Sequence, residues 1–273
     1  LFRSEIIDKF IMQAERIVTY RPAFIEYELR ARAHKKEWDF MSYNNDFKIE
    51  LSDLKENLRE GDLLVLGNPN NPTGLRIEEE KLRAIYSIVV EKKGFLLLDE
   101  AFYEFAPIDY DSIEIFRDEG YKRLVIIRAA TKFFSLPGIR LGYACTEKSN
   151  VEKLGKIELP WSINSLADLA GQFIFQDKTY VDKSRTYIER EREYIYKNLE
   201  KIDGLEPYKT DSNFMLIRLN SWTEEEVFKF LLEKGILIRK CSTFPGLKGN
   251  YVRIAIKDRM NNERLITVFN QLK

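Results

Sequence analysis

The 273-residue sequence has little of several residue types that often mark function. It contains two cysteines, Cys145 and Cys241, far apart and without metal-ligand spacing, and one histidine, His34, inside a basic run. This pattern favours neither a disulfide framework nor a metal site, so we expect two reduced thiols and no metal centre. For His34 we expect a solvated helix end rather than a catalytic role.

Net charge and long apolar runs are also absent. Lys and Arg total 44, as do Asp and Glu, so no net field favours nucleic acid or a membrane, and an anionic ligand requires individually placed residues. No apolar stretch approaches the roughly 20 residues of a membrane helix, and the first residues show no secretory signal. We therefore expect a cytoplasmic protein without nucleic-acid or membrane partners.

The composition, 44% hydrophobic and 13% aromatic, allows a substantial core. Apolar runs alternate with helical patterns along the first half of the chain. The expected strands are 16–19, 37–43, 62–66, 94–98 and 124–127, and the expected helices include 22–32, 78–92 and one beginning at Ser4. Such alternation predicts a mainly parallel α/β sheet covered on both faces. Because nothing ahead of Ser4 can pack on that helix, we expect a natural N-terminal part to precede it.

The second half follows another pattern. After a kinked link at 159–165, a long charged helical run continues to Lys201. Expected strands at 214–219, 236–239 and 251–256, with helices at 223–234 and 261–271, predict a small α+β domain. We therefore expect a large domain over residues 1–177 and a small C-terminal domain over 178–273.

One lysine lies among small and aromatic residues directly after an apolar run. Lys132 belongs to Ala-Ala-Thr-Lys-Phe-Phe-Ser-Leu-Pro-Gly, and Arg140 follows it by eight positions. A lysine partly removed from water is a candidate Schiff-base former, and an arginine offers paired donors to a phosphate. Pyridoxal phosphate, an aldehyde with its own phosphate, suits this pair. The alternative is a solvated loop lysine with a surface arginine.

Two upstream segments place polar residues where strands end. The turn Asn-Pro-Asn-Asn-Pro-Thr-Gly, over 68–74, follows one apolar run, and Asp99 ends the next. Ligands of open α/β sheets bind beyond the carboxyl ends of the strands. A carboxylate there can hold a protonated ring nitrogen. An ordinary surface turn and a helix N-cap are the alternatives.

Together these segments resemble, in order and spacing, the class I/II aminotransferase family of fold-type I pyridoxal-phosphate enzymes. The likeness runs from Ser4 to the C-terminus. It implies the fold-type I transferase fold, pyridoxal 5'-phosphate as cofactor and a homodimer. It also implies the following cofactor contacts: Lys132 for the aldehyde, Asp99 for the ring nitrogen, Asn71 for the phenolic oxygen, Phe24 for stacking on the ring, and Arg140, Thr131 and Ser4 for the phosphate.

The resemblance further implies residues that bind a small phosphorylated amino substrate. Arg253, inside an apolar alternation, would hold a carboxylate or an equivalent anion, Arg239 would bind the substrate phosphate, and Asn164 would also contact the substrate. Surface salt bridges are the alternative for both arginines. Position 102 is phenylalanine where typical aminotransferases carry tyrosine, and position 129 is alanine where many carry a hydroxyl.

Phe102 and the segment Phe-Pro-Gly-Leu at 244–247 favour one branch of the family. The expected reaction is decarboxylation of L-threonine O-3-phosphate. The alternative is transamination of histidinol phosphate with 2-oxoglutarate, and a less favoured one is a non-catalytic cofactor-binding module. In either reaction Lys132 would serve as the proton shuttle.

Overall fold

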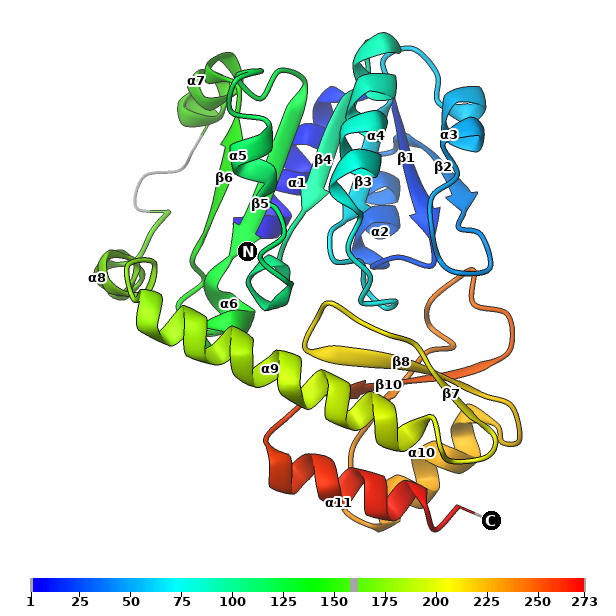
Figure 1. The fold of residues 1–273 in the computed structure, drawn as a ribbon. Helices are drawn as coiled ribbons and strands as arrows, with labels where there is room; N and C mark the ends of the chain where they lie inside the picture. Colours follow the sequence, from blue (N-terminus) through cyan, green and yellow to red (C-terminus); the bar gives the residue numbers. More distant parts are fainter. Residues whose placement is uncertain (1, 158–161, 273) are drawn as a thin grey trace.

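The structure is a computed structural model that describes residues 2–157 and 162–272. Its strands form two sheets that follow one another along the chain (Figure 1). The strands are β1 (Arg16–Arg21), β2 (Glu37–Ser42), β3 (Leu63–Gly67), β4 (Phe95–Asp99), β5 (Leu124–Ala129), β6 (Gly142–Thr146), β7 (Leu205–Pro207), β8 (Phe214–Leu219), β9 (Arg239–Lys240) and β10 (Asn250–Ala255).

The first sheet has the order β2-β1-β3-β4-β5-β6, and the second the order β7-β8-β10-β9. In the first sheet β1 to β5 pair in parallel, and only the edge strand β6 runs antiparallel, against β5. All pairs of the second sheet are antiparallel. The prediction of a mainly parallel α/β sheet followed by a smaller α+β part is confirmed.

The helices lie over both sheets. They are α1 (Phe2–Gln13), α2 (Glu26–Ala33), α3 (Leu51–Asn57), α4 (Glu79–Glu91), the 3₁₀ turn η1 (Tyr103–Phe105), α5 (Ser112–Ile115), α6 (Ala130–Phe133), α7 (Lys148–Ile157), α8 (Ser165–Ile174), α9 (Lys178–Leu199), α10 (Glu224–Glu233) and α11 (Arg259–Phe269). None of the helices formed by residues 2–157 and 162–272 combines the length and apolarity needed to cross a membrane.

Alternate side chains of the first sheet enter two different cores. Leu64, Leu96 and Ile126 pack with α3 and α4 on one face, and Val65, Leu97 and Ile127 pack with α1 and α2 on the other. Figure 1 shows α4 in front of the sheet and α1 behind it. Burial on both faces explains why these central strands are continuous apolar runs without polar alternation.

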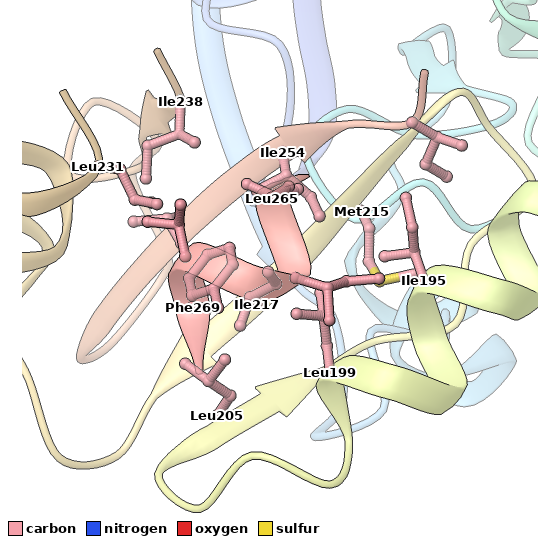
Figure 2. Close-up of a cluster of buried hydrophobic side chains, with 14 of the residues drawn as sticks. Ile195, Leu199, Leu205, Met215, Ile217, Leu231, Ile238, Ile254, Leu265 and Phe269 are labelled. Atoms are coloured by element: carbon pink, nitrogen blue, oxygen red, sulfur yellow. The ribbon is translucent and has the colours of Figure 1, made fainter. Parts of the chain in front are cut away.

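A third core fills the space between the second sheet and its helices (Figure 2). Met215 and Ile217 of β8 pack with Ile195 of α9, Leu231 of α10 and Phe269 of α11, all essentially without solvent exposure. The helix α9 contacts η1 near the first sheet and α11 below the second. It therefore connects the two parts, while the division at residues 177 and 178 stays a prediction.

The structure differs from the sequence expectation in several places. The single helical run to Lys201 is two helices, because Asp177 caps a new N-terminus by accepting a hydrogen bond from the Tyr180 amide. The strand expected at 236–239 is reduced to β9, and β6, α3 and α7 were not expected. His34 lies at a helix end as expected, as the C-cap of α2, but it is half-buried rather than fully solvated, and its Nε2 lies 3.1 Å from Asp8 Oδ1 of α1. Residues 159–161 of the expected link lie outside the described residues, and Ser165 at its end begins α8.

Candidate active site

The polar residues singled out in the sequence follow strands that end at one edge of the first sheet. Gly67, the last residue of β3, pairs with Asp99, and Asp99 pairs with Ile127 of β5. Because these strands are parallel, the segments that begin after Gly67, Asp99 and Ala129 leave the sheet at the same edge. Figure 1 shows this edge facing the second sheet.

Asp99 is buried at this edge, with 3% of its surface exposed. Its Oδ2 accepts a hydrogen bond of 2.7 Å from the Tyr27 hydroxyl, and its Oδ1 accepts one of 3.3 Å from the Ala101 amide. The helix-cap alternative is not what the structure shows, because Asp99 is itself the last residue of β4 and precedes a 3₁₀ turn. The Asp99 side chain is thus a buried carboxylate that Tyr27 of α2 holds in place.

Tyr27 is a site residue to which sequence reasoning assigned no role. It is 2% exposed and makes an edge contact with the Phe24 ring, whose centroid is 5.7 Å away. One hydrogen bond and one ring contact thus connect Phe24, the expected stacking residue, to Asp99. Phe24 lies just before α2 and Tyr27 within it, and the short spacing between these two aromatics was the available signal.

Asn71 and Arg253 meet although 182 positions separate them. An Arg253 Nη1 donates a hydrogen bond to Asn71 Oδ1, and the guanidinium lies 4.6 Å from the Phe214 ring centroid. Because arginine only donates, the amide oxygen of Asn71 faces it, and the amide nitrogen remains to donate elsewhere. Burial lowers the pKa of the Arg253 guanidinium, and the charge of Arg239 lowers it further.

The two arginines expected to bind substrate lie opposite each other. Arg239 of β9 pairs in register with Arg253 of β10. Directly opposed residues of antiparallel strands project from the same face, and like charges there repel. Arg239 is exposed and donates to Thr243 Oγ1 at 3.0 Å. Among the described residues, the hydrogen bonds and salt bridges given for the two arginines include none to a carboxylate.

Lys132 lies in α6, which begins directly after β5. The Ala130 amide donates to the Leu141 carbonyl at 3.1 Å, and Phe133 is buried against Phe105 with its carbonyl accepting from the Tyr180 hydroxyl at 2.9 Å. These contacts fix the helix on both sides of Lys132. Lys132 itself is exposed. Thr131 beside it is half-buried.

The remaining predicted contacts lie around α8 and α1. Arg140 is exposed, has a positive φ of 60°, and donates to the Pro137 carbonyl of its own loop at 2.8 Å. Asn164 caps α8 and donates to the Ile139 carbonyl at 3.0 Å, so it connects α8 to the Arg140 loop. Ser4 belongs to the first turn of α1, but its side chain lies outside the described part of the chain. The ligand roles of these residues stay predictions.

A second polar network, also missed from the sequence, anchors the residue after Asp99. Glu100 is completely buried and accepts from Asn68 Nδ2 at 3.0 Å and from Arg128 Nε at 2.9 Å. Arg128 also bonds Asp111 at 2.6 Å. Since Asn68, Glu100 and Arg128 belong to three adjacent strand ends, the network fixes the edge on which the site is built.

These residues fit pyridoxal phosphate. The cofactor needs an acceptor for its ring nitrogen, a donor for its phenolic oxygen and an amine for its aldehyde. The buried Asp99 carboxylate, the Asn71 amide nitrogen and the Lys132 amine are such groups and follow three neighbouring strands. Arg140 and Thr131, after the same strand as Lys132, have the donor chemistry that a phosphate requires.

Comparisons with known proteins agree with this arrangement. The family model "Aminotransferase class I and II" matches residues 4–269. A protein of Caldanaerobacter subterraneus subsp. tengcongensis named "Putative threonine-phosphate decarboxylase" is 36% identical over 92% of this chain and 69% of its own length. The histidinol-phosphate aminotransferase of Methanococcus maripaludis is 29% identical over 98% of this chain and 73% of its own.

Solved structures show the same fold. The crystal structure of the histidinol-phosphate aminotransferase from Clostridium acetobutylicum superposes with a TM-score of 0.93 at 34% identity, covering 98% of this chain and 80% of that one. The expected fold-type I architecture is confirmed. The chain therefore belongs to the class I and II aminotransferase family and is a pyridoxal-phosphate-dependent enzyme.

Proposed function

We propose that this enzyme decarboxylates L-threonine O-3-phosphate. The observation that carries the proposal is the cross-strand pair Arg239 and Arg253, two guanidinium groups on one face of the second sheet. A ligand with both a carboxylate and a phosphate offsets the repulsion between them, because guanidinium groups bind each of these anions through paired hydrogen bonds. A phosphorylated amino acid carries both anions.

Each of the following residues has a separate role in this reaction. Arg253, fixed by Asn71 and Phe214, binds one anionic group of the substrate, and Arg239 binds the other. Pyridoxal phosphate, when bound, supplies the electron sink that stabilises the carbanion formed at the substrate's α-carbon. Asp99 holds a proton on the ring nitrogen. After carbon dioxide leaves, the Lys132 Nζ delivers a proton to the α-carbon.

Phe102 supports decarboxylation over transamination. Its ring packs edge-on against Phe214 with centroids 5.1 Å apart. A phenylalanine offers no hydroxyl to the ring of the cofactor, unlike the tyrosine expected in typical aminotransferases. The 36% identity to the Caldanaerobacter protein supports the same choice.

Transamination of histidinol phosphate is the second candidate. It is supported by the 34% identity to the Clostridium acetobutylicum structure, whose title names that activity. Histidinol phosphate carries a phosphate but no α-carboxylate. It would therefore use Arg239 and leave Arg253 to the carboxylate of the second substrate, 2-oxoglutarate.

One assay separates the candidates. Purified holoprotein is incubated with L-threonine O-3-phosphate and, separately, with histidinol phosphate plus 2-oxoglutarate. Carbon dioxide release in the first supports the proposal, and glutamate formation in the second supports the alternative. Absence of both products would contradict both and favour a non-catalytic module.

We also infer that the working enzyme is a cytoplasmic homodimer. The helix α8 buries only Ala167, while Leu166, Leu169 and Phe173 are 71%, 54% and 67% exposed. Their spacing puts them on one helical face, and a second copy of the chain would cover it. The free thiols of Cys145 and Cys241 support a reducing compartment.

A further inference from the structure

A cavity of about 320 Å³ lies beside the Asn-Pro turn and is lined by none of the predicted cofactor or substrate residues. Asn70, the neighbour of Asn71, lines it together with Arg76 and, from the segment before β8, Asp211. Both a strand-end turn of the first sheet and the second part of the chain thus contribute to its wall.

Two buried polar atoms on residues of this wall lack partners within the described part of the chain. Asn70 is 4% exposed, and its Nδ2 donates to the Pro22 carbonyl at 3.1 Å and to Thr73 Oγ1 at 3.0 Å, whereas its Oδ1 accepts no hydrogen bond. The Arg76 Nε is likewise unpartnered. An unsatisfied buried polar atom costs about 1–3 kcal/mol, so a ligand that turns Asn70 Oδ1 toward the cavity and supplies an N–H group to it would bind favourably.

The charges around the cavity favour a ligand with two opposite ends. The Asp211 carboxylate accepts from the Arg76 amide at 3.0 Å through Oδ2, and burial raises the pKa of this carboxyl although the charges of Arg192 and Arg76 act in the opposite direction. A further cation in the cavity would stabilise its charged form. On the same wall Lys81 donates to the Ile49 carbonyl at 3.1 Å and Lys48 pairs with Glu78 at 3.1 Å. Both lysines line the cavity, so an anion bound there would lie beside them.

We propose that this cavity is a second binding site, for a small zwitterion whose ammonium group contacts Asn70 and Asp211 and whose carboxylate or phosphate contacts Lys48 and Lys81. Amino acids and aminoalkyl phosphates share this chemistry. Asn70 is joined by a peptide bond to Asn71, and the Asp211 amide donates to the Gly74 carbonyl at 2.8 Å. A ligand here would therefore act on the turn that presents Asn71 to the active site.

The test is calorimetric titration of the Arg253→Ala holoprotein, in which anion binding at the active site is weakened. The probes are O-phosphoethanolamine and β-alanine, which distinguish a phosphate from a carboxylate partner. We expect saturable one-site binding of at least one probe. Adding Lys81→Glu or Lys48→Glu should each weaken it at least tenfold.

The matched control is Lys55→Glu, because Lys55 is exposed, pairs with Glu91 and does not line the cavity. It should leave the affinity within twofold. The proposal would be overturned if neither probe bound to Arg253→Ala. It would also be overturned if the control lost as much affinity for the probe as the better folded of the two cavity variants. Neither outcome depends on which reaction the enzyme catalyses.

Discussion

A single hydroxyl fixes the carboxylate on which the cofactor site depends. The Tyr27 hydroxyl donates to Asp99 at 2.7 Å inside the protein. Hydrogen bonds to charged groups are stronger than neutral ones, so Tyr27→Phe should lower the free energy of unfolding by about 1.5–3 kcal/mol. Urea unfolding of the apoprotein measures this loss.

The control for that variant is Tyr86→Phe, which removes a hydroxyl that donates to the Lys122 carbonyl at 2.9 Å. Because this acceptor is neutral, the expected loss is only about 1 kcal/mol. Equal losses in the two variants would show that the Tyr27 hydroxyl has no special relation to the Asp99 charge.

Glu104 gives the protein a stability that depends on pH. Burial raises the pKa of this carboxyl to about 7, from an ordinary value of 4.5. The folded state therefore binds the proton more tightly than the unfolded state, and the stabilisation is complete below pH 4.5 and lost as the pH rises through 7. We expect Glu104→Gln, which mimics the protonated form, to flatten this dependence.

Urea unfolding at pH 5 and pH 8 measures the effect. The complete shift from 4.5 to about 7 corresponds to roughly 3 kcal/mol, most of which is lost between pH 5 and pH 8. The free energy of unfolding of Glu104→Gln, minus that of the parent protein, should therefore be larger at pH 8 than at pH 5. The same difference at both pH values would contradict the raised pKa of Glu104.

At the scale of elements, the Asn-Pro turn is held against the segment before β8. Gly74 has a φ of 75°, and a Cβ placed on it would lie 2.0 Å from Thr210 Oγ1. Gly74→Ala must therefore move Thr210 and the turn that carries Asn71. We expect its thermal unfolding temperature to fall well below that of Gly120→Ala, together with a weaker affinity for pyridoxal phosphate.

Gly120→Ala is the matched control because Gly120 has a φ of 61° and no atom within 4 Å of a Cβ. It should show only the strain of a left-handed residue, about 1–2 kcal/mol, and unchanged cofactor affinity. If the two variants had the same unfolding temperature and cofactor affinity, the close approach between Gly74 and Thr210 would not contribute to either property.

The elements recovered from the sequence are those with a local signal. The buried runs that became β3, β4 and β5 and the turn formers after them placed Asn71, Asp99 and Lys132 at one sheet edge. The break between α8 and α9 was missed because Asp177, its cap, is one acidic residue in a charged run. The contacts of Arg253 with Asn71 and of Tyr27 with Asp99 join distant segments, and no local pattern specifies such partners.

At the scale of the whole molecule, the exposed apolar face of α8 predicts self-association. Phe173→Glu introduces a charge at a position that is 67% exposed, so it should leave the fold intact and change a dimer to a monomer. Light scattering after gel filtration measures the mass. The control is Glu193→Lys, a charge change on the exposed face of α9, which should stay dimeric. A monomeric parent protein would contradict the inference.

We propose that Lys132 carries the cofactor, and chemical trapping of the bound cofactor tests this assignment. Holoprotein is reduced with borohydride and digested, and the peptides are analysed by mass spectrometry. We predict a pyridoxyl group on the peptide that contains Lys132. An adduct on a different lysine, with the Lys132 peptide unmodified, would contradict this role of Lys132.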